Sequence, residues 1–190
     1  KDLKKVESRL LDGDDDCPWF RIEQAQEQEG PEIYNFMQRI YEGIPDKSWF
    51  SMDKEEKILH YVTTSGFALK AEGYRGGNEH ELGGIFIART SELGEENLGK
   101  YLNLDEEELA RVAHMEIAMV DEKFRGKGLQ KSLMEAAEEH LKFLGYHWLM
   151  GTAHPENVYS VNNFRKLGYE IVAEDLKYGG LPRYVFCKKI

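Results

Sequence analysis

Apolar residues recur along the chain with two different periods, which predict strands and helices. Apolar–polar alternation or a short apolar run predicts a strand, whereas apolar residues three and four positions apart predict a helix. The predicted strands cover residues 19–25, 67–72, 82–90, 112–120, 146–153, 169–175 and 183–188. The predicted helices cover residues 31–41, a short segment capped by Asp53, residues 105–110, residues 128–144 and a segment between 156 and 168. This order predicts a mixed α/β fold without the regular alternation of a doubly wound nucleotide-binding fold.

The strand at residues 112–120 carries the most information. Strict alternation gives one face four apolar side chains, from Ala113, Met115, Ile117 and Met119. The opposite face then carries His114, Glu116, Ala118 and Val120. Two titratable side chains are therefore expected to share one face, directly before a glycine turn. The alternative is that this face is simply solvated.

The segment after this strand reads V-D-E-K-F-R-G-K-G-L-Q-K-S, from Val120 to Ser132. Gly126 and Gly128 lie among four basic residues, and an amphipathic helix follows. Amides in the first turn of a helix have no partner within the helix, and the helix dipole favours negative charge there. A strand, a basic glycine turn and a helix N-terminus together predict a site for the pyrophosphate of a nucleotide-like cofactor.

Several well-known catalytic motifs are absent from the sequence. No segment fits the phosphate-binding pattern G-x-x-x-x-G-K-[ST], and Lys131 stands where a dinucleotide fingerprint would need its third glycine. The patterns H-E-x-x-H, G-x-S-x-G and paired C-x-x-C are also absent. NTP hydrolysis, hydride transfer and metalloprotease chemistry therefore have no support.

Composition and charge limit the partners. The 190 residues carry a formal net charge of −10, which argues against a broad nucleic-acid-binding surface and mildly favours a cationic substrate such as an amine. Cys17 and Cys187 are far apart without metal or redox spacing, so free thiols and no bound metal are expected. No apolar run approaches the length of a membrane span, so we expect a cytoplasmic protein without a membrane partner.

Two motifs resemble those of the GNAT superfamily of acyl-CoA-dependent N-acyltransferases. The first, [QR]-x-x-G-x-[GA], is matched by Arg125 and Gly128, while Gln130 replaces the small last residue. The second, N-x-x-[AS]-x-x-x-[YF]-x-K-x-G-[FY], is matched by Asn157, Ser160, Phe164, Lys166, Gly168 and Tyr169. The resemblance implies a mainly antiparallel central sheet of about seven strands flanked by helices. This domain would cover residues 19–190, after a charged extension over residues 1–18.

By this resemblance the protein is an N-acetyltransferase that moves an acetyl group from acetyl-CoA directly to a primary amine of a small molecule or protein. Acetyl-CoA would lie between strands 112–120 and 146–153. Members of this superfamily are often dimers, so a homodimer is possible. The implied coenzyme A contacts are the backbone of Met119 and Val120, the turn from Arg125 through Gly126, Lys127, Gly128, Leu129 and Gln130 to Lys131, and the side chains of Asn157, Ser160 and Phe164. Asn157 also fits a helix N-cap.

Acyl transfer to an amine calls for a base, because amines are mostly protonated at neutral pH. Glu116 is the first candidate base and His114 the second, with a strand amide near Met119 for the oxyanion. Phe164 stands where many family members have the tyrosine that protonates the leaving thiolate. Tyr159, Ser160 or water would then take this role. The alternative function is a non-catalytic acyl-CoA-binding or sensing domain on the same fold.

Overall fold

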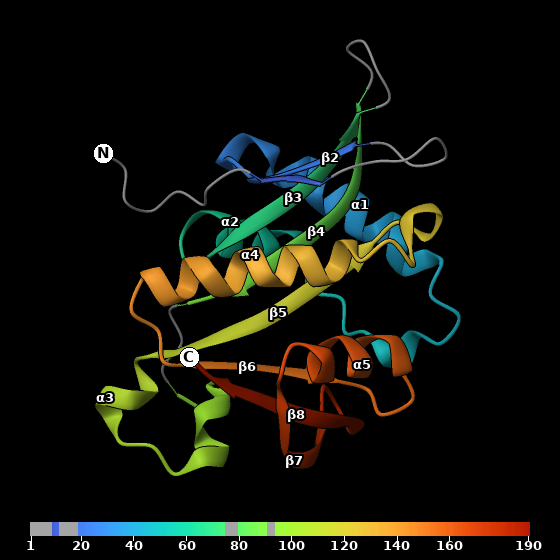
Figure 1. The fold of residues 1–190 in the computed structure, drawn as a ribbon. Helices are drawn as coiled ribbons and strands as arrows, with labels where there is room; N and C mark the ends of the chain where they lie inside the picture. Colours follow the sequence, from blue (N-terminus) through green and yellow to red (C-terminus); the bar gives the residue numbers. More distant parts are fainter. Residues whose placement is uncertain (1–8, 12–18, 75–79, 91–93) are drawn as a thin grey trace.

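The computed structural model describes residues 9–11, 19–74, 80–90 and 94–190, which form one curved sheet with helices on both faces (Figure 1). The strands of this described part are β1 (Arg9–Leu11), β2 (Trp19–Gln24), β3 (Gly66–Tyr74), β4 (His80–Arg89), β5 (Val112–Val120), β6 (Trp148–Ala153), β7 (Glu170–Lys177) and β8 (Leu181–Lys189). They pair in the order β1-β2-β3-β4-β5-β6-β8-β7. Every neighbouring pair is antiparallel except β5 and β6, which are parallel.

The helices of the described residues lie between these strands. The α-helices are α1 (Gly30–Glu42), α2 (Glu55–Thr63), α3 (Glu106–Leu109), α4 (Leu129–Phe143) and α5 (Val158–Lys166). Short 3-10 turns are η1 (Glu27–Glu29), η2 (Lys47–Trp49), η3 (Leu98–Leu102) and η4 (Glu122–Phe124). No helix in these described ranges is both long enough and apolar enough to cross a bilayer.

The predicted fold class is confirmed, and most predicted elements lie within two residues of the observed ones. The short strand β1 was not predicted. It pairs with β2 and lies inside the predicted extension, whose residues 1–8 and 12–18, Cys17 included, lie outside the described residues. The predicted cap at Asp53 is wrong. Helix α2 starts after Lys54, and Asp53 instead forms an ion pair with Lys57 at 3.2 Å.

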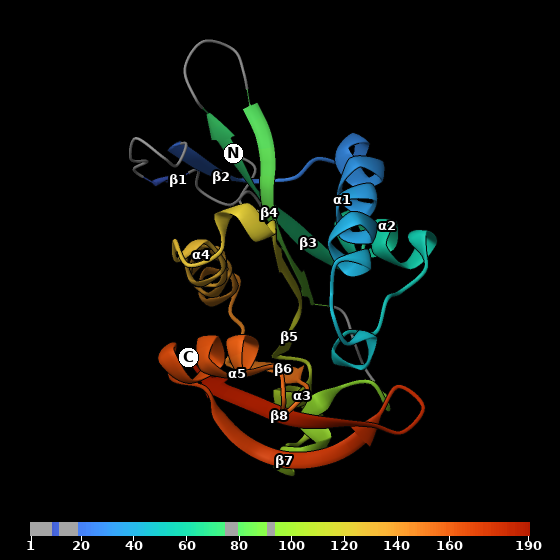
Figure 2. The ribbon, with the colours of Figure 1, turned by 90° about the vertical axis from the view of Figure 1, so that its right-hand side faces the viewer.

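Helices α1 and α2 lie on one side of the sheet, and α4 and α5 lie on the other (Figure 2). The apolar stripe of α4 packs with the side chains of β3 and β4 that face it, and Leu133 and the fully buried Phe86 share this core. On the opposite side, Met37 of α1 and Ile58 of α2 share a core with Ile85 of β4. The two helical layers bury most of the sheet, because each helix has one apolar face to cover.

Strand β5 contains a bulge at Glu116. Ile117 pairs with Ile87, but Met115 pairs with the next residue of β4, Ala88. Glu116 is therefore the one residue of β5 without an opposite partner at this point. A bulge of this kind inserts one extra residue and changes which way the following side chains face.

The strict alternation predicted for residues 112–120 is consequently wrong. Before the bulge, Ala113 and Met115 pack into the core under α4 and α5. After it, Val120 packs into that core, and Ile117 and Met119 face the core under α1 and α2. The extra residue reverses the facing of the second half of the strand.

Strands β5 and β6 pair only at their starts. The paired residues are Val112–His114 and Trp148–Met150. Beyond them, β5 continues alongside β4 and β6 continues alongside β8. The sheet is therefore split between β5 and β6 over their second halves, and Figure 1 shows the two strands diverging.

Candidate active site

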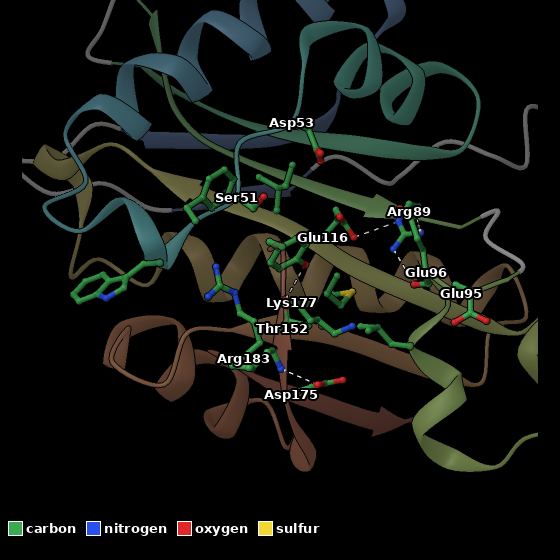
Figure 3. Close-up of a pocket in the computed structure, with 18 of the residues that line it drawn as sticks. Ser51, Asp53, Arg89, Glu95, Glu96, Glu116, Thr152, Asp175, Lys177 and Arg183 are labelled. Atoms are coloured by element: carbon green, nitrogen blue, oxygen red, sulfur yellow. Dashed lines mark hydrogen bonds and ion pairs between the residues drawn. The ribbon is translucent and has the colours of Figure 1, made fainter. Parts of the chain in front are cut away.

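Two cavities meet at the split between β5 and β6. One, of about 290 Å³, lies between β5 and helices α4 and α5 and is called the α4–α5 cavity. The other, of about 370 Å³, lies between β5, the segment before α2 and the β7–β8 hairpin, and is called the β7–β8 cavity (Figure 3). The residues that line both are Trp49, Phe50, Met115, Glu116 and Thr152.

The glycine turn before α4 borders the α4–α5 cavity. Gly126 and Gly128 have φ angles of 79° and 75°, in the left-handed region that favours glycine. Gly128 is the N-cap of α4, and Ser132 N donates to Gly128 O at 3.0 Å. Ser132 is therefore the first residue whose amide bonds to a carbonyl of the helix. The amides before it in the turn have no acceptor within the helix. With Arg125 on the cavity wall, this arrangement can bind an anion.

Helix α5 supplies the opposite wall of the α4–α5 cavity. Asn157 is its N-cap, with Oδ1 accepting a hydrogen bond from Ser160 N at 3.3 Å. Tyr159, Ser160 and Phe164 also line the cavity. The buried ring of Phe164 stacks on Phe186, with ring centroids 4.5 Å apart. Phe164 therefore packs like a core residue and carries no hydroxyl.

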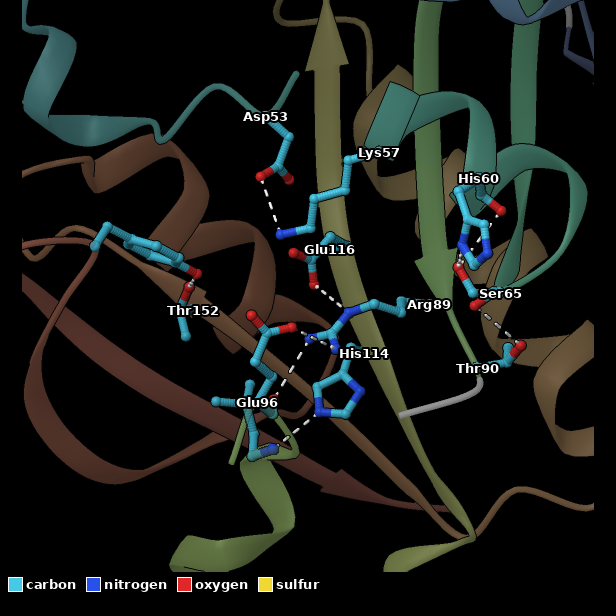
Figure 4. Close-up of polar contacts among 12 residues, drawn as sticks. Asp53, Lys57, His60, Ser65, Arg89, Thr90, Glu96, His114, Glu116 and Thr152 are labelled. Atoms are coloured by element: carbon cyan, nitrogen blue, oxygen red, sulfur yellow. Dashed lines mark hydrogen bonds and ion pairs between the residues drawn. The ribbon is translucent and has the colours of Figure 1, made fainter. Parts of the chain in front are cut away.

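Glu116 lies where the cavities meet, and Arg89 is its ion-pair partner. Arg89 Nε lies 3.3 Å from Glu116 Oε2 (Figure 4). Burial raises the pKa of Glu116, and the nearby Arg89 charge partly opposes this effect. A carboxylate with a raised pKa is a stronger base than an exposed one. The bulge brings this group to the opening.

His114 occupies a different environment. Its side chain is fully buried, and Nε2 accepts the Leu98 N–H at 2.9 Å (Figure 4). Burial, followed by the charges of Arg89 and Lys177, lowers its pKa to about 3. The ring is therefore neutral near pH 7, with its acceptor nitrogen already occupied. His114 lines neither cavity and holds η3 against β5.

Comparison with known proteins gives the family of the chain. The model of the acetyltransferase (GNAT) family matches residues 18–169, which is most of the chain. The chain belongs to this GNAT family. No curated protein matches the sequence.

Solved structures similar to this chain include other GNAT proteins. The acetyltransferase of GNAT family from Streptococcus pneumoniae is 17% identical with a TM-score of 0.67, over 90% of this chain and 99% of that one. Arabidopsis thaliana NAA60, solved with a bisubstrate analogue, is 13% identical with a TM-score of 0.70, over 90% of this chain and 99% of that one. The NatC complex, solved with Gag peptide and CoA, is 10% identical with a TM-score of 0.68, over 90% of this chain and 98% of that one. These likenesses show the GNAT fold.

The structure brings most of the predicted catalytic and coenzyme A-binding residues to one place. Those lining the α4–α5 cavity are Glu116, Met119, Val120, Arg125, Gln130, Asn157, Tyr159, Ser160 and Phe164. Gln130, which departs from the motif, is buried. Besides His114, five others line neither cavity. They are Gly126, Lys127, Gly128, Leu129 and Lys131.

Three of these five residues have side chains that lie outside the cavities. Leu129 is buried in the core under α4, and Lys131 pairs with Glu135 at 3.7 Å. Lys127 is exposed. If this turn binds an anion, the backbone amides are the groups in position to do so.

Sequence reasoning missed several polar residues of the site. Arg89, Thr152, Tyr178 and Arg183 all line the β7–β8 cavity, and Tyr178 Oη lies 3.3 Å from Thr152 Oγ1. None belongs to a GNAT motif. The available signal was weak: charged residues, Arg89 and Arg183, at the ends of otherwise apolar strand segments.

Proposed function

We propose that this chain transfers an acetyl group from acetyl-CoA directly to a primary amine. The observation that carries the proposal is the position of Glu116, which lines both the α4–α5 cavity and the β7–β8 cavity. The first cavity borders an anion-binding helix N-terminus, as the diphosphate end of coenzyme A requires. The second is open for the acceptor. Glu116 faces the point where donor and acceptor would meet.

The residues of the α4–α5 cavity fit the parts of coenzyme A. The amides from Gly126 to Lys131 and the Arg125 guanidinium would hold the pyrophosphate. The pantetheine would run along β5 at Met119 and Val120, whose edge no longer pairs with β6. Asn157 would contact the pantetheine from α5. CoA bound to the NatC complex, a structural neighbour, supports this choice of donor.

In the proposed reaction Glu116 accepts a proton from the acceptor amine, directly or through a water. The neutral nitrogen then attacks the acetyl carbonyl, and a β5 amide near Met119 stabilises the oxyanion. Collapse of this intermediate breaks the carbon–sulfur bond, and the nitrogen, which is cationic in the intermediate, loses its second proton to give the neutral amide. The leaving thiolate takes up one proton, so the two protons lost by the ammonium group end on the thiol and in solvent. Glu116 returns its own proton to solvent.

Tyr159 is the proposed donor of the thiolate proton, because it lines the α4–α5 cavity and Phe164 carries no proton to give. Tyr159→Phe is expected to lower kcat by about 10²-fold, the lower end of the usual effect of losing a general acid. Steady-state thiol release measures this. Tyr178→Phe is the matched comparison on the β7–β8 side. An unchanged kcat for Tyr159→Phe would leave Ser160 or water as the donor.

The alternative is an acyl-CoA sensor without catalytic activity, which Phe164 at the usual tyrosine position favours. Thiol release from acetyl-CoA, measured against polyamines, amino acids, aminoglycosides and peptides, separates the two functions. The proposal expects turnover with at least one amine class. Tight binding of acetyl-CoA by calorimetry, without turnover on any amine, would support the sensor instead.

A further inference from the structure

Arg183 is a buried cation on the wall of the β7–β8 cavity. Its residue is 3% exposed, and its side chain points toward the cavity from β8 (Figure 3). Nη1 donates to Pro182 O and Nη2 donates to Ser48 O, each at 2.8 Å. Both acceptors are neutral carbonyl oxygens. Among the described residues, no carboxylate lies within ion-pair distance of this guanidinium.

A buried guanidinium without an anion is costly, because burial removes the hydration that stabilises its charge. Burial lowers the pKa of Arg183, with no nearby carboxylate to oppose the effect. Its five N–H groups form a planar fork that suits a carboxylate, and only two nitrogens have the partners above. The other buried arginine of this cavity, Arg89, pairs with both Glu116 and Glu96. Arg183 therefore differs from Arg89: its partners among the described residues are two carbonyl oxygens and the ring of Tyr178, whose centroid lies 5.2 Å from Cζ, and none is a carboxylate.

The acidic side chains that line the cavity have partners other than Arg183. Asp53 pairs with Lys57 at 3.2 Å, Glu116 with Arg89 at 3.3 Å, and Glu95 with Lys100 at 3.9 Å. Asp175 accepts a hydrogen bond from the Tyr101 hydroxyl. Lys177 also lines the cavity, with its Nζ 5.2 Å from the Tyr101 ring centroid. The cavity therefore presents cationic groups that its own carboxylates leave available for an anion.

We propose that the acceptor is a small primary amine that also carries a carboxylate, as an amino acid does. Arg183 binds the carboxylate by its remaining N–H groups, and the amine faces Glu116, which lines the same cavity (Figure 3). This inference rests on the proposed function and adds the class of acceptor. Lys177 contributes a second positive charge for the same group.

The test uses pairs of acceptors that differ only in the carboxylate, such as alanine with alaninamide and glutamate with its α-amide. Thiol release is followed with the wild type, Arg183→Gln and Arg183→Lys. The wild type is expected to prefer the carboxylate in each pair. Arg183→Gln should reduce kcat/KM for the carboxylate-bearing acceptor by about 10- to 100-fold, mostly by raising KM. A loss of this size is the usual effect of removing a hydrogen bond to a charged group. The amide acceptor should be little affected, and Arg183→Lys should recover part of the loss.

Arg165→Gln, which removes an exposed arginine of α5, is the matched control, and calorimetry with acetyl-CoA checks that each variant is folded. Equal use of carboxylate and amide by the wild type would overturn the inference. Equal loss on both acceptors in Arg183→Gln would also overturn it, because a purely structural contact to Ser48 predicts that pattern. Acidic dipeptides and their amides show whether a peptide carboxylate serves instead of a free amino acid, and a preference confined to the dipeptides overturns the small-molecule assignment.

A failure of the proposed function gives a different result. If no amine is acetylated, the same amino acids are titrated by calorimetry into the protein–CoA complex. Binding by the wild type that weakens at least about 10-fold in Arg183→Gln supports the carboxylate site even without turnover. Absence of binding overturns it.

Discussion

Replacing Glu116 with glutamine is expected to lower kcat/KM for the amine by about 10²- to 10⁴-fold, the usual effect of removing a general base. Glutamine keeps the size and the bulge geometry but cannot accept the proton. Its side chain can still contact Arg89, so the fold should be retained. Steady-state thiol release at several pH values measures the effect, and acetyl-CoA affinity by calorimetry should change little.

The pH dependence tests the same assignment. Burial raises the pKa of Glu116, so the base form is present above that raised pKa and is lost as pH falls through it. The wild type should therefore lose activity on the acid side at a pH above the ordinary carboxyl range, and Glu116→Gln should lack this limb. Glu95→Gln removes an exposed carboxylate at the cavity rim, and this variant should retain the acid limb of the pH–rate profile.

His114 provides the contrasting variant. His114→Leu leaves the buried Leu98 N–H without its acceptor, which should cost about 1–3 kcal/mol of unfolding free energy. Denaturant unfolding measures this cost. The acid limb should remain, because the neutral buried ring is not the proposed base. Loss of the limb in His114→Leu, with retention in Glu116→Gln, would exchange the two roles.

Replacing Gly128 with aspartate is expected to weaken acetyl-CoA binding by at least about 100-fold. The added carboxylate would stand at the N-terminus of α4 beside the proposed pyrophosphate. Like charges about 4 Å apart repel by about 4 kcal/mol at an effective dielectric of 20. A Cβ at Gly128 meets no other atom within 4 Å, so the effect should be electrostatic and conformational rather than steric. Calorimetry with acetyl-CoA at low and high salt measures it.

The same helix offers a matched control. Gly145 follows the C-terminal end of α4, has a φ of 90° and is equally open to a side chain. Gly145→Asp repeats the backbone strain away from the proposed pyrophosphate site and should leave binding nearly unchanged. Gly128→Asn separates strain from charge, because asparagine tolerates the left-handed region. Equal binding by Gly128→Asp and the wild type would contradict the phosphate assignment.

The fold could be predicted from the sequence because its elements carry strong local signals. The stripe of Leu129, Leu133, Ala137 and Leu141 predicts a helix from its own spacing, and the observed α4 buries all four. The glycine turn likewise depends on local backbone conformation, and Gly126 and Gly128 adopt the left-handed values that glycine permits. Strand β1 could not be predicted, since three residues carry too little pattern.

The sequence by itself therefore determined the order of the elements other than β1, the glycine turn before α4 and the family motifs, all of which depend on residues near one another in the chain. Only the tertiary structure decided which side chains face the cavities. The bulge at Glu116 exists only in the register between β4 and β5, and it reversed the predicted facing of the strand. His114 lines neither cavity, because it is buried and η3 packs over it, with the Leu98 N–H donated to Nε2. Arg183 lines the β7–β8 cavity where β8 lies beside Ser48, 135 residues away in the chain. Such long-range contacts leave no periodic trace in the sequence.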